Sequence, residues 1–186
     1  MSFKQSRKSQ RPIQGGFTLI ELMVAITVLA IVVAVAVPSF TDMINNYRSV
    51  SLAEDFVSGL NFARSEAVKR GTNVSVCASS NGTDCAGANN WSDGWIAFTD
   101  GAATEKAGAP VVNTVLRSWS FEEGNAVINV NQNAATNFLR FTGMGILGRF
   151  TPTTINSKVS GCTGDSARSI GVARSGVISI AKASCE

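Results

Sequence analysis

The sequence predicts an α+β fold in which a long N-terminal helix packs on a C-terminal antiparallel β-sheet. Three observations point to this class. Residues 17–37 are almost wholly apolar, residues 38–71 are amphipathic with helical spacing, and residues 72–186 contain short strand-like runs. A helical region followed by strands is typical of the α+β class, because the helix can cover one face of the sheet.

The apolar segment reads FTLIELMVAITVLAIVVAVAV and carries one charged side chain. A helix of this length spans about 30 Å, the thickness of the hydrocarbon core of a bilayer. The leader, residues 1–16, contains no acidic residue and four basic ones: Lys4, Arg7, Lys8 and Arg11. Basic flanks stay in the cytoplasm, so we expect one membrane-spanning helix and export of the remainder.

The formal net charge of +3 depends on this leader. The whole chain has 16 basic and 13 acidic side chains, and removal of the four in the leader leaves 12 against 13, a formal charge of −1. The basic excess therefore indicates membrane orientation and does not predict a folded domain that binds polyanions.

Glu21 is the single charge of the apolar segment. A secretory signal peptide cut after Ala34-Val35-Ala36, or a plain membrane anchor, would leave this carboxylate without a role. At the bilayer centre it would cost about 2.5–3.5 kcal/mol. Cleavage between Gly16 and Phe17 would create an α-amino group, and that amine on a neighbouring subunit could pair with Glu21.

Residues 38–71 continue the helix. Apolar side chains from Phe40 to Val68 recur mostly at spacings of three and four, which predicts one buried stripe. We expect Pro38 to kink the helix and Gly71 to cap it, giving a helix from about residue 17 to 70.

From Asn73 the apolar pattern changes to period two, beginning with Val74 and Val76. Further strands are expected at 95–99, 111–119, 126–130, 138–142, 169–173 and 177–181. The last two flank Arg174-Ser175-Gly176 and predict a terminal hairpin.

The four cysteines allow three pairings, and in an exported domain disulfides are the default. We favour Cys77–Cys85 and Cys162–Cys185, since each closes a local loop rich in Gly, Asn and Ser. The alternative is four free thiols in a cytoplasmic protein, which the export signal disfavours.

Charges in the C-terminal region are unevenly distributed. Acidic residues prevail from Asp84 to Glu123 and basic ones from Arg140 onward, which predicts either two faces of a stacking subunit or ordinary solvated surface. Asp93, Asp100 and Glu105 do not have EF-hand spacing, so we expect them to be acids of surface loops.

The segment Gly16-Phe17-Thr18-Leu19-Ile20-Glu21, followed by a long apolar run, resembles the type IV prepilin class. The resemblance implies that a prepilin peptidase cuts after Gly16 on the cytoplasmic side and methylates Phe17. It also implies that Glu21 is the assembly carboxylate.

A second motif, Trp91-Ser-Asp-Gly-Trp95-Ile-Ala-Phe98-Thr-Asp100, resembles the W-x-x-G-W-x-x-F-x-D signature of the GspH/FimT branch of minor pilins and pseudopilins. The resemblance implies the type IV pilin fold, with residues 72–186 as the GspH/FimT-like domain. We expect the three aromatic side chains to be core anchors of a sheet packed on the helix, and not a platform for base stacking.

The resemblance implies a minor pilin of the bacterial inner membrane, with its globular domain in the periplasm, that joins other major and minor pilins and initiates pilus assembly. A pseudopilin of a type II secretion system is the alternative within the same branch. No enzymatic activity, cofactor, metal or small-molecule substrate is expected. The sequence lacks histidine, which excludes Ser-His-Asp and Cys-His sites, and Gly143-x-Gly145-x-x-Gly148 lacks a βαβ context.

DNA binding is a further alternative, since some members of the branch bind DNA through a Gly-Arg-x-Arg motif. The matching stretch here, 176–179, reads Gly-Val-Ile-Ser and lacks both arginines. Four other basic residues remain candidates for phosphate contact: Arg149, Arg168, Arg174 and Lys182. Phosphate binding requires these charges to cluster in the fold.

Overall fold

The computed structural model describes residues 16–87, 91–105, 108–121, 124–131, 137–148 and 152–185. The chain divides into two compact units, Met1–Ser39 and Phe40–Glu186. The boundary lies inside helix α1, which runs from Leu19 through Pro38 to Arg70. The helix predicted for residues 17 to 70 is therefore confirmed to within two residues.

Helix α1 ends in the predicted glycine cap. Gly71 has a φ of 65°, a conformation that glycine adopts at little cost. The N–H of Thr72 donates to the carbonyl oxygen of Ala67 at 3.3 Å, and the N–H of Gly71 donates to that of Val68 at 3.3 Å. This pair of bonds is the Schellman motif, which satisfies the last carbonyl groups of a helix.

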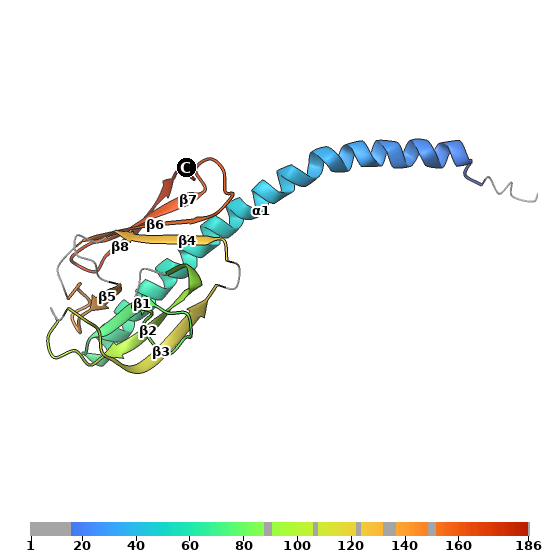
Figure 1. The fold of residues 1–186 in the computed structure, drawn as a ribbon. Coiled ribbons are helices and arrows are strands. Elements are labelled where there is room, and N and C mark those ends of the chain that lie inside the picture. Colours follow the sequence, from blue (N-terminus) through green and yellow to red (C-terminus); the bar gives the residue numbers. More distant parts are fainter. Residues whose placement is uncertain are drawn as a thin grey trace, which may run out of the picture. The chain divides into compact units, whose positions relative to one another are not determined.

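The second unit contains two four-stranded antiparallel sheets, where the sequence analysis expected one (Figure 1). The first has the order β3-β2-β1-β5 and comprises β1 (Val74–Ala78), β2 (Gly94–Asp100), β3 (Val112–Ser120) and β5 (Phe138–Phe141). The second has the order β4-β6-β7-β8 and comprises β4 (Ala126–Asn131), β6 (Thr153–Val159), β7 (Ala167–Val172) and β8 (Ile178–Ala183). A 3-10 helix, η1 (Trp91–Asp93), precedes β2.

Strand β6 was not predicted, although it holds the second sheet together. Its side chains alternate strictly between buried and less buried positions, and it pairs with both β4 and β7. The inward positions are Thr153, Ile155, Ser157 and Val159, so two of the four buried side chains are hydroxyl-bearing. An alternation of apolar and polar residues is therefore not visible in this strand.

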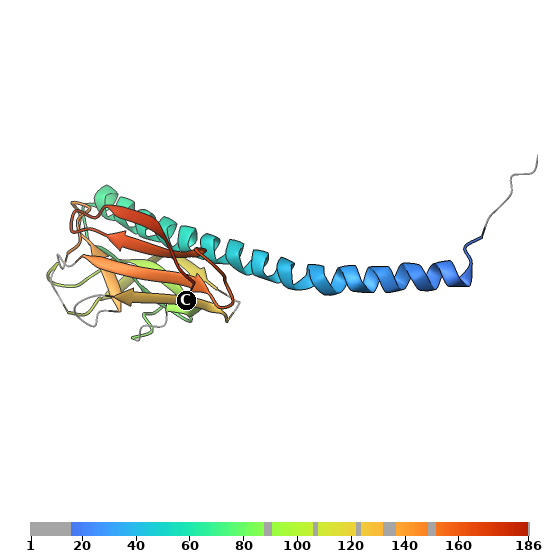
Figure 2. The same ribbon diagram turned by 90° about the horizontal axis from the view of Figure 1, so that it is seen from above.

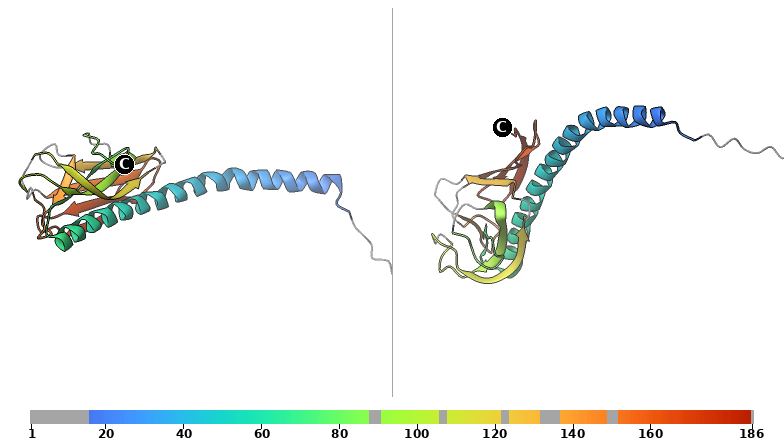
Figure 3. Two further views of the ribbon diagram at one scale, coloured as in Figure 1. Left: turned by 90° about the horizontal axis from the view of Figure 1, so that it is seen from below. Right: turned by 45° about the vertical axis from the view of Figure 1, so that its right-hand side comes forward.

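The main hydrophobic core lies between the second half of α1 and both sheets. It joins helix residues such as Phe56 and Leu60 to Val76 of the first sheet and Ile155 of the second. Figure 2 shows the orange-to-red strands of the second sheet side by side along this part of the helix, and Figure 3 shows the same layers from two further sides.

The predicted terminal hairpin is confirmed as β7, a turn at 173–177, and β8. The N–H of Ala173 donates to the carbonyl oxygen of Val177 at 2.9 Å, and Gly176 has a φ of 77°. A side chain at Gly176 would overlap the carbonyl oxygen of Gly145, and one at Gly143 would lie 2.6 Å from the carbonyl carbon of Gly71. The glycines at 143 and 145 thus allow close backbone packing beside the end of α1.

Candidate processing and assembly site

The N-terminal end of the described chain presents a short extended segment before a capped helix. Gly16, Phe17 and Thr18 precede α1, and Phe17 is exposed. The hydroxyl group and the N–H of Thr18 donate to Oε2 of Glu21 at 3.2 and 3.3 Å. The N–H of Glu21 donates back to Oγ1 of Thr18 at 3.3 Å.

These reciprocal bonds form a capping box, in which the first residue before a helix and the third residue within it satisfy each other's free N–H groups. Glu21 therefore has a local structural role that the sequence analysis missed. The signal was available, because Thr18-Leu19-Ile20-Glu21 is a T-x-x-E pattern before an apolar run. Within the described residues only Oε2 of this carboxylate takes part in hydrogen bonds, so Oε1 is available to a further partner.

Helix α1 is long and apolar enough to cross a membrane. Apolar side chains on all sides of its first half are exposed, among them Leu22, Ile26 and Leu29. The hydroxyl group of Thr27 donates to the carbonyl oxygens of Met23 and Val24, at 3.0 and 2.8 Å, so this polar group is satisfied within the helix. A helix that is apolar all round requires an apolar environment such as a membrane or packed helices.

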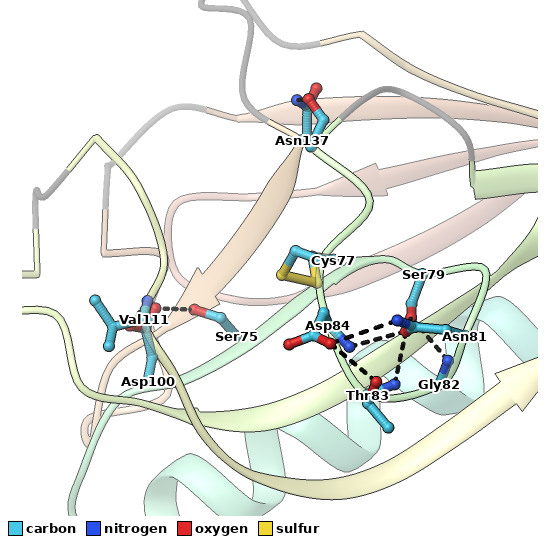
Figure 4. The surroundings of a disulfide bond; sticks show 12 residues. Ser75, Cys77, Ser79, Asn81, Gly82, Thr83, Asp84, Asp100, Val111 and Asn137 are labelled. Carbon is cyan, nitrogen blue, oxygen red and sulfur yellow. Dashed lines mark hydrogen bonds between the residues drawn. A yellow bond between two sulfur atoms is a disulfide. The ribbon is translucent and has the colours of Figure 1, made fainter.

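In the structure Cys77 is bonded to Cys85 and Cys162 to Cys185, which are the pairs favoured from the sequence. The first disulfide closes a loop after β1 (Figure 4). Inside this loop the side-chain oxygen of Asn81 accepts hydrogen bonds from the N–H groups of Thr83 and Asp84, at 2.9 and 3.0 Å.

The second disulfide joins the C-terminal end to a loop that contacts α1. The N–H of Thr163 donates to the side-chain oxygen of Asn46 at 2.8 Å, and the N–H of Val159 donates to the hydroxyl oxygen of Ser49 at 3.0 Å. Asn45 donates to the carbonyl oxygen of Gly161 at 3.4 Å. Polar residues of the helix thus hold the disulfide-bonded loop in place.

The prediction that Asp100 lies in a surface loop is wrong, because its carboxylate is buried beside Arg140. Nε of Arg140 lies 2.8 Å from Oδ2 of Asp100, and both side chains are inaccessible to solvent. The same oxygen accepts from the hydroxyl group of Ser75 at 2.6 Å, and Oδ1 accepts from the N–H groups of Ala102 and Val111 at 3.0 and 2.9 Å.

This buried ion pair fixes the loop that joins β2 to β3. The two terminal nitrogens of Arg140 donate to the carbonyl oxygens of Glu105 and Ala109, each at 3.1 Å. Burial alone would raise the pKa of Asp100, but the hydrogen bonds from Arg140, Ser75 and the two N–H groups lower the pKa below its usual range. Asp100, from the acidic stretch of the sequence, and Arg140, from the basic stretch, are therefore both buried.

The prediction that the signature aromatic residues are core anchors is confirmed. Trp91 and Trp95 are buried and meet the ring of Phe56 edge-to-face, with centroid separations of 5.5 and 5.0 Å. Phe98 is also buried, but it lies on the opposite face of β2 in a second cluster with Cys77 and Phe138. Packing on the helix therefore explains the burial of the two tryptophans but not that of Phe98.

Of the basic residues that were candidates for DNA contact, the described part of the structure brings two together and places a third away from them. Arg168 and Lys182 are cross-strand neighbours on β7 and β8. Arg174 lies in the hairpin turn, six residues from Arg168 and therefore about 20 Å along the strand. Arg149 lies outside the described residues.

A capped apolar helix that continues into a disulfide-bonded β-domain defines a pilin-type subunit. The family described as the type II transport protein GspH matches residues 52–176, and the prokaryotic N-terminal methylation motif matches residues 11–37. The chain therefore belongs to the GspH family of type IV minor pilins and pseudopilins. No protein of curated function matches it.

Two crystal forms of the type IV minor pilin FimU of Pseudomonas aeruginosa share the fold. One has a TM-score of 0.52 at 23% identity and covers 73% of this chain and 98% of that chain. The other has a TM-score of 0.55 at 22% identity and covers 75% and 96%, respectively. At this level of identity the likeness concerns the fold alone.

Proposed function

We propose that this protein is a minor pilin that is processed at Gly16–Phe17 and helps to initiate type IV pilus assembly. The leader stays in the cytoplasm, a prepilin peptidase cleaves it and methylates Phe17, and α1 remains in the inner membrane with the β-domain in the periplasm. The observation that carries this proposal is the exposed Gly16–Phe17 segment beside a capped helix of membrane length.

Assembly then uses the carboxylate of Glu21. A neighbouring subunit presents the positive amine of Phe17, which pairs with Oε1 while Oε2 keeps its cap bonds to Thr18. In an apolar layer this pairing stabilises the correct register, because an unpaired charge there is costly.

The N-terminus of the mature protein tests the processing step. Mass spectrometry of the protein isolated from membranes should find a chain that begins at methylated Phe17. A chain that begins at Val37, after the Ala34-Val35-Ala36 site, would contradict the proposal, because it would lack Glu21 and most of the membrane segment.

A second candidate is a pseudopilin of a type II secretion system, favoured by the description of the matching family. A strain that lacks this protein separates the two. Loss of surface pili with normal protein secretion supports the minor pilin, whereas loss of secretion with normal pili supports the pseudopilin. Complementation with the unaltered gene is the control in both assays.

A further inference from the structure

The exposed side of α1 in the second unit carries a shallow groove of about 750 Å³ that none of the roles above uses. Its lining includes small polar side chains, those of Ser58, Asn61 and Ser65. Cationic and apolar side chains form the rest of the lining: Phe62, Arg64, Val68, Lys69 and Arg117. Among the described residues no carboxylate lines the groove.

Two guanidinium groups are held in position at this groove. Arg117 of β3 lies over the rings of Trp119 and Phe62, at 4.9 and 5.8 Å from their centroids. Nε of Arg64 donates to the carbonyl oxygen of Gly145 at 2.9 Å. These contacts use the aromatic faces and one N–H group. Among the described residues nothing else bonds to the two guanidinium groups, so their remaining donors are free to bind an anionic partner.

Glu66 lies beside this groove and pairs with two cations. It accepts a hydrogen bond of 2.7 Å from Nε of Arg70, and its other carboxylate oxygen lies 3.6 Å from Nζ of Lys69. The net positive charge of the lining therefore comes from Arg64 and Arg117.

The same helix carries a complementary surface three turns earlier. Glu54 and Asp55 are adjacent, exposed, and diverge by about 100° around the helix axis. They lie 10 residues, or about 15 Å, before the level of Arg64. Ser51 and Ser58 flank them, so small side chains line the exposed face on both sides of the carboxylates.

We propose that this groove binds the Glu54–Asp55 segment of a second copy of this chain, placed parallel and shifted by about 15 Å along the helix axis. Glu54 of one copy then meets Arg117 of the other, and Asp55 meets Arg64. The contact is head-to-tail, so the groove of one copy and the acidic segment of the other lie outside it. The proposal rests on the minor-pilin role proposed above.

The groove fits a carboxylate-bearing helix better than a nucleic acid. Binding of a phosphate backbone depends on many cations along its path. Here the groove has two arginines and a lysine that is paired with Glu66, and Glu54 and Asp55 of the same helix would repel a phosphate chain. A short acidic segment needs only the two positioned arginines.

The test uses the full-length chain in its native membranes, with a photoreactive benzoylphenylalanine at Asn61. Irradiation should give a dimer whose cross-linked peptide contains residues 51–58. Arg117→Glu alone and Glu54→Arg alone should each lower the dimer yield by about tenfold, and the double variant should restore it. Lys182→Glu, an exposed charge change on β8, is the matched control and should have no effect.

Four outcomes would overturn the proposal: no cross-link, a cross-link to nucleic acid, a cross-link to another protein only, or a double variant as weak as the single ones. Glu54 lies on an exposed helix face, so the Glu54→Arg variant should fold and still tests the contact if the Arg117→Glu variant does not fold. Cleavage at Phe17 and surface pili are measured in the same cells. If both are normal while the dimer is absent, the docking proposal fails and the proposed function stands.

Discussion

Glu21 has two roles that substitution can separate. The capping box needs a hydrogen-bond acceptor at this position, whereas pairing with an amine needs a negative charge. Glu21→Gln keeps the acceptor and removes the charge, while Thr18→Ala removes the cap and keeps the charge. We expect Glu21→Gln to abolish assembly with normal cleavage, and Thr18→Ala to cost about 1 kcal/mol of helix stability with assembly retained.

Counting surface pili and analysing the mature N-terminus in both strains tests this separation. If Thr18→Ala abolished assembly as completely as Glu21→Gln, the cap itself would be the essential feature and the pairing role of Glu21 would be lost.

Gly176 is confined both by its backbone conformation and by its neighbour. Its φ is 77°, and a side chain here would overlap the carbonyl oxygen of Gly145. Gly164 is the matched control, since its φ is 60° but nothing lies within 4 Å of a side chain placed there. Alanine at Gly164 should cost about 1–2 kcal/mol. Alanine at Gly176 should cost at least about 2 kcal/mol more, because the hairpin must also move away from Gly145.

Urea unfolding of the mature protein in detergent measures both free energies. Equal losses at the two positions would mean that the contact between the hairpin and Gly145 contributes nothing to stability.

Among the structural elements, the loop between β2 and β3 is held by the Asp100–Arg140 ion pair. Removing Arg140 leaves the carboxylate of Asp100 buried without its cation, so Arg140→Leu should destabilise the domain by about 3–5 kcal/mol. Asp100→Asn in the same chain removes that charge and should recover part of the loss. A double variant no more stable than Arg140→Leu alone would show that the loop, and not the unpaired charge, determines the cost.

The same pair gives a pH dependence. The pKa of Asp100 is lowered in the folded protein, so the folded state favours the ionised carboxylate. Its contribution is fully present above the unfolded pKa of about 3.9 and is lost as the pH falls below that value. Unfolding free energies from pH 7 to pH 2.5 should fall more steeply for the unaltered protein than for Asp100→Asn.

The two disulfides should stabilise the domain to different extents. The sequence separations are 8 residues for Cys77–Cys85 and 23 for Cys162–Cys185. Loop-closure entropy then predicts losses of about 2.5 and about 3.4 kcal/mol when each pair is replaced by serine. Thermal unfolding of the two double-serine variants measures the order, and a larger loss for the shorter loop would contradict the entropic argument.

At the scale of elements, the sequence predicted what depends on local spacing. The helix, its glycine cap, seven of the eight strands and the hairpin around Gly176 follow from apolar periods and turn residues. Strand β6 did not, because Thr153 and Ser157 are buried and its polar composition conceals the alternation. The division into two sheets depends on strand pairing, which local periodicity does not specify.

The candidate site was predicted to a similar degree. The assembly role expected for Glu21 stays a prediction, and its bonds to Thr18 were overlooked although the T-x-x-E pattern was present. The Asp100–Arg140 pair joins residues 40 positions apart, so only the fold brings these charges together. Charge blocks counted along the sequence therefore did not identify which charges are on the surface.

At the scale of the whole molecule, the processing proposed at Gly16–Phe17 would change the sign of the net charge. The full chain carries a formal charge of +3 and has a sequence pI of about 8.8, whereas the chain from Phe17 has 12 basic and 13 acidic side chains. A pilus assembled from such subunits does not attract polyanions through its overall charge. Under the docking proposal, the local arginines of the groove then select an anionic partner.

Isoelectric focusing tests this change directly. The precursor should focus near its sequence pI of about 8.8, and the mature protein should focus below pH 7, because cleavage removes four cations and no acid. Cleavage before Val37 would also remove Glu21 and leave 12 charges of each sign, so that product should focus at a higher pH than the chain from Phe17. Focusing combined with the intact mass therefore separates the three forms. A chain from mature membranes that still focuses near the precursor would show that the leader, with its four cations, is retained.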